Sequence, residues 1–367
     1  MNIAWNKHKR GREANLDMAK TRTSGACARV DKMNKKWRIE GLEPYYTTEF
    51  GAAYLGDSLK VLNRIHQNSV HLIMTSPPFA LQRKKRYGNV KAEDYVEWFT
   101  PFAEEFRRVV RPDGSLVIHI GGSWMKGKPV KSIYQYELLV KMCKELGFFL
   151  AQDMYWFNRA KLPGPAQWVT VNRWRLKDSV DQIWWLAKTT EPKADNRRVL
   201  KVYSEAMKEL LSNNNYYKPN VRRPSEHKIS AKFYNGHKGA IRPNIFEYSN
   251  TDSNSKYIRL CRQYGIKPNP ARYPVQLPEF FIKFLTNPGD KVLDPFAGSN
   301  ATGEAAERSK RKWISIDIER EYLLGSMLRF FDKIALETKY GFSKQVGLAS
   351  LGQESEKDKR QTPTLES

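Results

Sequence analysis

The chain has 367 residues, of which 63 are Lys or Arg and 39 are Asp or Glu, so it carries a formal net charge of +24 at pH 7. Hydrophobic residues make up 40% and aromatic residues 12%, which excludes a fully disordered protein and allows one large core. The sequence contains neither an apolar run of roughly 18 residues, as a membrane-spanning helix needs, nor a secretory signal. The charge excess predicts a polyanionic partner, and nucleic acid is the usual one.

Strand and helix patterns alternate along the chain. Short apolar runs predict strands, and amphipathic runs predict helices between them. The expected strands cover 51–58, 69–79, 114–122, 151–158, 181–188, 290–294 and 312–319, and the expected helices cover 58–65, 94–110, 134–148, 277–286 and 302–309. This order is typical of a doubly wound α/β fold, with a mostly parallel sheet and helices on both faces.

Three segments depart from the alternation. Residues 1–32 are polar and basic and are expected to form a flexible extension, and the chain from about Ser350 has the composition of a disordered tail. Residues 190–272 hold 17 Lys or Arg against 7 Asp or Glu, which predicts an inserted, loop-rich basic module.

The cysteines and histidines suggest no metal site. Cys27, Cys143 and Cys261 form no CxxC pair, and six histidines are scattered along the chain. An intracellular protein without a disulfide framework and without a metal is therefore expected.

A possible cofactor turn follows the strand near residue 293. The sequence LDPFAGSNATG takes an apolar strand into Asp294, through a glycine-containing turn, and into a helix near Thr302. A second carboxylate, Asp317, follows the next strand at about the spacing of an acidic residue that binds ribose hydroxyls. The turn is neither G-x-G-x-x-G nor a P-loop, so on its own it can also be an ordinary strand–turn–helix with a capping Asp.

A second motif, TSPPF, follows the strand that ends near residue 75. Pro77 and Pro78 fix the backbone, Ser76 offers a hydroxyl, and Phe79 offers an aromatic face. A hydroxyl, a carbonyl and a ring side by side suit a planar base that carries an exocyclic amine. The alternative from these residues alone is a proline-rich loop that closes a strand.

Taken together, TSPPFALQRKKRYGN and DPFAGSNATG resemble the amino-methylating DNA methyltransferases that use S-adenosylmethionine. The SPP motif precedes the cofactor turn by more than 200 residues, which is the beta-type order, and the resemblance covers about Met33 to Asp332. Within the family the sequence is most similar to the cytosine-N4 group and its PvuII-type modification enzymes. The resemblance implies a methyltransferase domain in two parts, 33–189 and 273–335, around a target-recognition module at 190–272, with a largely disordered end at 336–367.

The resemblance also implies roles for individual residues. The catalytic motif is formed by Ser76, Pro77, Pro78 and Phe79, and the segment from Arg272 to Phe284 covers the methionine part of the cofactor. The implied cofactor-binding residues are Asp57, Asp294, Phe296, Gly298, Ser299 and Asp317. Trp156 and Asn158 are expected to line the base pocket, and the alternative for Trp156 is a place in the core.

The target atom follows in part from elimination. Methylation of a ring carbon needs a cysteine after a proline, and none of the three cysteines has one. Between the two amines, Ser76 favours cytosine N4, because the adenine-N6 enzymes of the family usually carry Asp or Asn there. Adenine N6 stays open, as does a DNA-binding protein without activity.

Two basic regions are expected to bind double-stranded DNA. The loop after the catalytic motif carries Arg83, Lys84, Lys85 and Arg86, which suit phosphate contacts. The 190–272 module carries Arg222, Arg223 and Arg242, which are of a type that reads base edges. The resemblance further implies a prokaryotic cytoplasmic enzyme that acts as a monomer on the palindrome CAGCTG, beside a separately acting restriction endonuclease.

Overall fold

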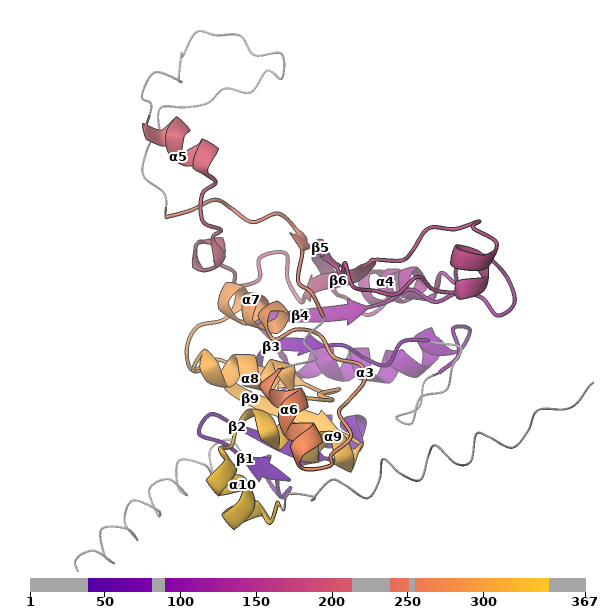
Figure 1. The fold of residues 1–367 in the computed structure, drawn as a ribbon. Helices are drawn as coiled ribbons and strands as arrows, with labels where there is room; N and C mark the ends of the chain where they lie inside the picture. Colours follow the sequence, from indigo (N-terminus) through magenta and orange to yellow (C-terminus); the bar gives the residue numbers. More distant parts are fainter. Residues whose placement is uncertain (1–38, 81–89, 213–237, 251–254, 343–367) are drawn as a thin grey trace, which may run out of the picture.

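The computed structural model describes residues 39–80, 90–212, 238–250 and 255–342. A single sheet runs through these residues in the strand order β1-β2-β9-β8-β3-β4-β6-β5-β7 (Figure 1). Its strands are β1 Tyr46–Thr47, β2 Gly51–Leu55, β3 Val70–Thr75, β4 Val110–Ile120, β5 Phe149–Phe157, β6 Val180–Ala187, β7 Ile245–Phe246, β8 Lys291–Asp294 and β9 Lys312–Asp317. The five central strands β2, β9, β8, β3 and β4 are parallel, and β6 is antiparallel to both of its neighbours. The predicted doubly wound α/β sheet is confirmed.

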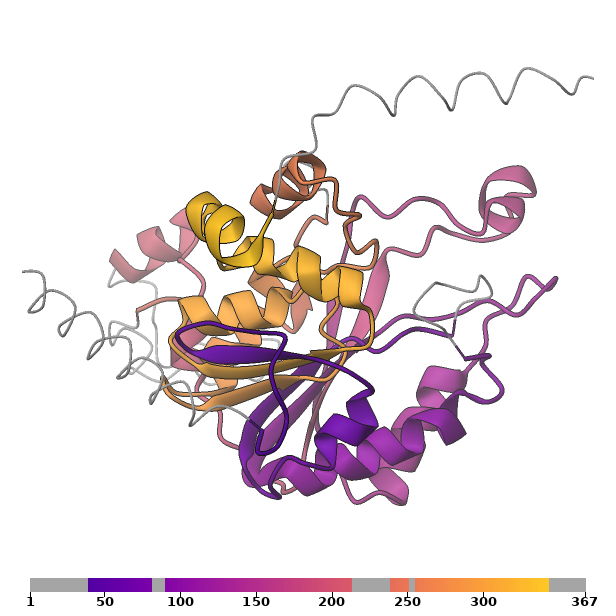
Figure 2. The same cartoon turned by 90° about the horizontal axis from the view of Figure 1, so that it is seen from below.

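Helices cover both faces of the sheet (Figure 2). One face carries α2 Ser58–Leu62, α3 Tyr95–Val109 and α4 Tyr134–Lys144, and the other carries α6 Lys256–Gln263, α7 Gln276–Leu285, α8 Ala301–Arg308 and α9 Arg320–Ser326. The remaining helical segments are η1 Gln167–Val171, η2 Asn196–Val199, α5 Glu205–Ser212, η4 Met327–Arg329 and α10 Lys333–Tyr340. Within the described parts of the chain, no helix is long and apolar enough to cross a membrane.

The two faces arise from the alternation of side chains along each strand. Leu116 and Ile118 of β4 pack into the core under α3 and α4, whereas Val117 between them packs into the core under α7 and α8. All three side chains are fully buried. Successive residues of a strand point to opposite faces, so a run of consecutive apolar residues is what a sheet with two covered faces requires.

Strand β4 differs from its prediction at the start. The turn-like sequence Pro112-Asp113-Gly114 predicts a start at Gly114, yet the strand begins at Val110. Val70 of β3 pairs with Val110 and Leu72 with Ser115, so the turn-like residues form an irregularity inside the strand. A β-carbon on Gly114 would lie 3.0 Å from the His71 carbonyl oxygen, which explains why glycine suits this close approach.

The sheet reverses its winding between β3 and β8. From β3 the chain passes through α3 to β4 on one side, and from β8 it passes through α8 to β9 on the other. In open parallel sheets, ligands bind beyond the carboxyl ends of the strands at such a switch point. TSPPF follows β3 and the DPFAG turn follows β8, so the two sequence motifs meet there.

Part of the basic segment 190–272 belongs to this framework. Phe246 on β7 pairs with Trp156 of β5, and Tyr257, Ile258 and Cys261 on α6 are buried in the core beside α9. Leu336 on α10 is also buried, at the start of the predicted tail. The extension 1–32, the rest of the tail from 343 and residues 213–237 lie outside the described residues, so the predicted domain division stays a prediction.

Two neighbouring connections project from one end of the sheet (Figures 1 and 2). Residues 121–133 follow β4 and residues 158–179 join β5 to β6; together we call them the arm. Lys131 pairs with Asp178 at 2.8 Å, and Arg175 Nε donates to the Pro129 carbonyl at 3.0 Å. These contacts hold the two halves of the arm together.

Candidate active site

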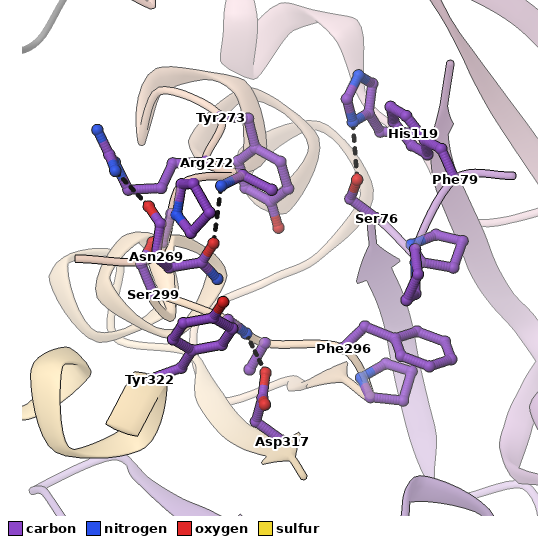
Figure 3. A pocket seen from close by; sticks show the side chains of 18 of the residues that line it. Ser76, Phe79, His119, Asn269, Arg272, Tyr273, Phe296, Ser299, Asp317 and Tyr322 are labelled. Carbon is purple, nitrogen blue, oxygen red and sulfur yellow. Dashed lines mark hydrogen bonds between the residues drawn. The ribbon is translucent and has the colours of Figure 1, made fainter. Parts of the chain in front are cut away.

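One cavity of about 810 Å³ lies at the switch point of the sheet (Figure 3). Its wall contains the motif Ser76–Phe79, the turn Pro295–Ser299, Asp57 and Asp317. Residues on the two sides are separated by more than 200 positions in the sequence, so the fold alone brings them together. The end near Asp317 is called the turn end, and the end near Ser76 is called the serine end.

Asp294 joins the two motifs from behind the cavity wall. Its carboxylate accepts hydrogen bonds from Thr75 Oγ1 at 2.8 Å, Thr302 Oγ1 at 2.6 Å, and Tyr273 Oη at 3.2 Å. Burial raises its pKa above the ordinary value, against the lowering effect of these hydrogen bonds. Because Thr75 directly precedes Ser76, Asp294 fixes the end of β3 relative to the turn, and it is not among the residues that line the cavity.

The turn end is organised by the Asp317 carboxylate. Oδ2 accepts from the Gly298 backbone N–H at 2.6 Å, and Oδ1 accepts from the Glu319 N–H at 2.8 Å. Gly298 has φ of +51°, and a β-carbon there would lie 2.3 Å from Asn269 Nδ2, so only glycine fits. Burial raises the pKa of Asp317 to about 6.

Three further predicted residues lie around this end. Asp57 caps α2 by accepting from the N–H groups of Leu59 and Lys60, and it lines the cavity. Phe296 also lines the cavity and packs against Phe102 of α3, with ring centroids 5.1 Å apart. Ser299 lines the cavity and accepts a hydrogen bond from Arg329 Nη2 at 3.0 Å.

The serine end is rich in aromatic rings. Phe79 lies edge-on to the His119 ring, with centroids 5.4 Å apart. The Pro78 carbonyl already accepts a hydrogen bond from Tyr95 Oη at 2.9 Å, which favours the Pro77 carbonyl as an acceptor for a ligand. Trp156 is both core and cavity wall: it is 3% exposed, and its Nε1 donates to the Tyr248 carbonyl at 2.8 Å.

Sequence reasoning missed a polar group at the serine end. His119 on β4 and Asp181 on β6 both line the cavity, and His119 Nδ1 lies 2.9 Å from Ser76 Oγ. Lys161 reaches Asp181 Oδ1 at 2.6 Å from the arm. The only sequence signal was polarity: His119 interrupts the apolar part of β4, and Asp181 stands with Gln182 at the start of the apolar strand β6.

The segment before α7 closes the cavity opposite β3. Arg272 donates to the Asn269 carbonyl, and the Tyr273 hydroxyl oxygen lies 2.5 Å from Thr302 Oγ1. Asn269, Arg272 and Tyr273 all line the cavity (Figure 3). The beginning of the segment that was expected to cover the cofactor therefore does lie on the cavity wall.

Most of the predicted DNA contacts cannot be placed. Residues 83–86, Arg222 and Arg223 lie outside the described residues. Arg242 is exposed, and its Nε donates to the Val199 carbonyl at 2.7 Å. It is not among the residues of the cavity wall.

Comparison with known proteins decides the family. A family model described as DNA methylase matches residues 70–327, which include both motifs and all the residues of the cavity wall except Asp57 and Ser58. The chain belongs to this DNA methylase family. The resemblance seen in the sequence is confirmed.

The relatives of this methylase share most of its length. It is 48% identical over 300 residues to Type II methyltransferase M.PvuII of Proteus hauseri, which covers 82% of this chain and 89% of that protein. It is 27% identical to Type II methyltransferase M.HpaI of Haemophilus parainfluenzae, over 76% of this chain and 75% of that protein. Among solved structures, the cytosine-N4-specific PvuII DNA methyltransferase matches with a TM-score of 0.65 and 44% identity, over 80% of this chain and 90% of that one.

Proposed function

We propose that this methylase transfers a methyl group from S-adenosylmethionine to the N4 amine of a cytosine in double-stranded DNA, as the modification enzyme of a restriction–modification system. The observation that carries the proposal is the single cavity shared by the Ser76 hydroxyl and the turn after β8. The similarity to M.PvuII, which covers 82% of this chain, supports the same assignment.

The turn end suits the methyl donor. The Asp317 carboxylate has lone pairs beyond those that hold Gly298 and Glu319, and these can accept the two ribose hydroxyls. Ile318, Phe296 and Tyr322 offer apolar and aromatic surface on the same wall. We assign the methionine part to the stretch Pro295–Ser299 with Asn269–Tyr273 opposite, and we assign Asp294 the indirect task of holding this turn.

The serine end suits the acceptor amine. The amine of cytosine is a weak nucleophile because its lone pair is delocalised into the ring. Ser76 Oγ and the Pro77 carbonyl can each accept one N–H, which favours a pyramidal nitrogen with its lone pair directed at the methyl group. Phe79 and Trp156 provide rings around a base that has left the duplex.

The arm offers a path for the duplex beside the cavity. It carries eight Lys or Arg residues and one acidic residue, Asp178. Lys161 and Asn158 belong to both the arm and the cavity wall, so the arm begins at the mouth where a flipped base would enter. Basic side chains in this place suit the phosphates next to the target.

The finer parts of the assignment rest on similarity to the modification enzymes. Cytosine rather than adenine follows from Ser76, and the site CAGCTG follows from the PvuII-type resemblance. A monomer suffices, because each strand of a palindrome offers one target in turn. The partner endonuclease would act on the same site as a separate protein.

The test is an analysis of the product. The full chain is incubated with methyl-labelled S-adenosylmethionine and duplexes that contain CAGCTG or a scrambled site, and the DNA is digested to nucleosides for mass analysis. Labelled N4-methyldeoxycytidine from the CAGCTG duplex alone is expected. Labelled N6-methyldeoxyadenosine would show that adenine, and not cytosine, is the target base. DNA without label would overturn the proposed methyltransferase activity.

A further inference from the structure

Ser76 is backed by a buried histidine. His119 is 5% exposed, and its Nδ1 lies 2.9 Å from Ser76 Oγ (Figure 3). Its Nε2 lies 3.8 Å from Asp181 Oδ2 and has no closer hydrogen-bond partner among the described residues. Ser76 follows β3, His119 lies on β4 and Asp181 lies on β6, and all three side chains line the cavity.

Among the residues that the structure describes, few charged groups lie near His119. Asp181 faces it from β6, Lys161 from the arm lies behind Asp181, and the Tyr273 ring faces it at 6.1 Å. Tyr134 also lies near Asp181, with its hydroxyl bonded to the Gly121 carbonyl. The rings of Phe79 and Trp156 also lie edge-on to the imidazole, with centroids 5.4 and 5.3 Å away.

Asp181 is ionised in this setting. Burial acts to raise its pKa, but the interaction with His119 and the charge of Lys161 outweigh burial and hold the pKa at about 2. A carboxylate beside Nε2 favours the tautomer that carries its proton there. Nδ1 is then an acceptor for the Ser76 hydroxyl, and the lone pairs of Ser76 Oγ are left for the substrate amine.

Methyl transfer to an amine creates a proton that has to leave. The nitrogen lone pair forms the N–CH₃ bond while the S–CH₃ bond breaks and its electron pair stays on sulfur. The positive charge of the sulfonium thereby passes to nitrogen, which must lose one N–H proton to give the neutral product. A proton acceptor next to the reacting amine therefore serves this reaction.

On the basis of the proposed function, we propose that His119 takes up this proton through the Ser76 hydroxyl, and that Asp181 positions the ring and stabilises its charged form. The amine passes a proton to Ser76 Oγ while the hydroxyl proton of Ser76 moves to His119 Nδ1. The products are the methylated base, S-adenosylhomocysteine and an imidazolium next to the Asp181 carboxylate. The single positive charge is conserved from sulfonium to imidazolium.

The test is the pH profile of single-turnover methyl transfer with the full chain, at S-adenosylmethionine concentrations that saturate each variant at every pH. Wild type is expected to lose rate on the acid side along a single ionisation, because a protonated His119 cannot accept. In His119→Asn the amide can still accept from Ser76 but cannot take up a proton. We expect its rate to fall by about 10²-fold and the acid limb to disappear.

A matched control is available on β3. His71 lies 3.2 Å from Asp290 through Nε2, and its Nδ1 accepts from the Lys291 N–H at 3.1 Å, so it repeats the arrangement away from the cavity. His71→Asn should keep both the rate and the acid limb. Affinity for S-adenosylmethionine and thermal stability should stay at the wild-type level in both variants.

A second variant keeps the test decisive if His119→Asn does not fold. Asp181→Asn removes the charge that favours the imidazolium, so the midpoint of the acid limb should move to lower pH. An unchanged acid limb in either variant would overturn the proton path, even where wild type forms N4-methylcytosine. Absence of that product from wild type would instead overturn the proposed function.

Discussion

The two ends of the cavity are built in different ways. The turn end consists of backbone held by carboxylates: Asp317 binds the N–H groups of Gly298 and Glu319, and Asp294 binds that of Phe296. The serine end consists of side chains from β3, β4 and β6, joined through Ser76, His119 and Asp181. The first arrangement suits tight and specific binding of a cofactor, and the second suits movement of a proton.

This contrast predicts that substitutions at the two ends change different kinetic parameters. The serine end should control the rate of methyl transfer at saturating cofactor. The turn end should control the concentration at which saturation is reached.

The largest effect is expected for Ser76→Ala. The variant loses one positioned partner of the reacting amine, and such a loss typically costs about 10²–10³ in rate. The loss is measured as the single-turnover rate of methyl transfer at saturating S-adenosylmethionine. Ser69→Ala is the control, because Ser69 lies at the start of β3 and its hydroxyl bonds the His66 carbonyl; full turnover by Ser76→Ala would remove Ser76 from the chemistry.

Asp317→Ala should weaken binding of the methyl donor. The loss of charge-assisted hydrogen bonds to the ribose costs about 1.5–3 kcal/mol, or roughly 10–150-fold in affinity. Calorimetry with the cofactor alone measures this change. Asp332→Ala is the control, because it removes a carboxylate that caps α10 at the Ala335 N–H. Its affinity for the cofactor should be unchanged. If both variants lost the same affinity, the role of Asp317 would be structural and not one of cofactor binding.

The raised pKa of Asp317 predicts a pH effect on binding. The ribose hydroxyls of the cofactor donate hydrogen bonds to the ionised form of the Asp317 carboxylate. A protonated Asp317 must therefore lose its proton when the cofactor binds. With a pKa of about 6 in the free protein, affinity should be constant above pH 7 and should fall by up to about tenfold per pH unit below 6. Calorimetry between pH 5 and 8 tests this, and Asp317→Ala should show a flat profile if the effect comes from this group.

A smaller and unspecific effect is expected on the arm. Lys126, Lys128 and Arg173 are exposed there, and their replacement by Gln should weaken binding to CAGCTG and scrambled duplexes alike. The slope of log affinity against log salt should decrease by roughly 0.9 for each phosphate that the variant no longer neutralises. Lys333→Gln with Lys339→Gln on α10 is the control, and a weakening confined to the CAGCTG duplex would show that the arm reads bases.

The turn end could be predicted from sequence because its residues lie close together in the chain. Asp294, Gly298 and Asp317 belong to one strand–turn–helix–strand unit, in which local geometry decides where the carboxylates lie. The indirect position of Asp294 could not be predicted, because it depends on Thr75, which is 219 residues away.

The serine end could be predicted only as far as Ser76–Phe79. His119 and Asp181 become neighbours because β4 and β6 pair antiparallel, with His119 opposite Ile183. β4 and β6 are not consecutive in the chain, so their register depends on the packing of the whole sheet and leaves no local pattern in the sequence. Helix α6 was missed for a similar reason: its buried Tyr257, Ile258 and Cys261 stand among charged residues.

The most direct test of the two-ended cavity is one titration: the single-turnover rate against S-adenosylmethionine concentration for Ser76→Ala and Asp317→Ala. Ser76→Ala is expected to keep the half-saturating concentration and to lose about 10²–10³ of the maximal rate. Asp317→Ala is expected to approach the wild-type maximum at a roughly 10–150-fold higher concentration. If both variants changed the same parameter, the assignment of binding to one end and of chemistry to the other would be contradicted.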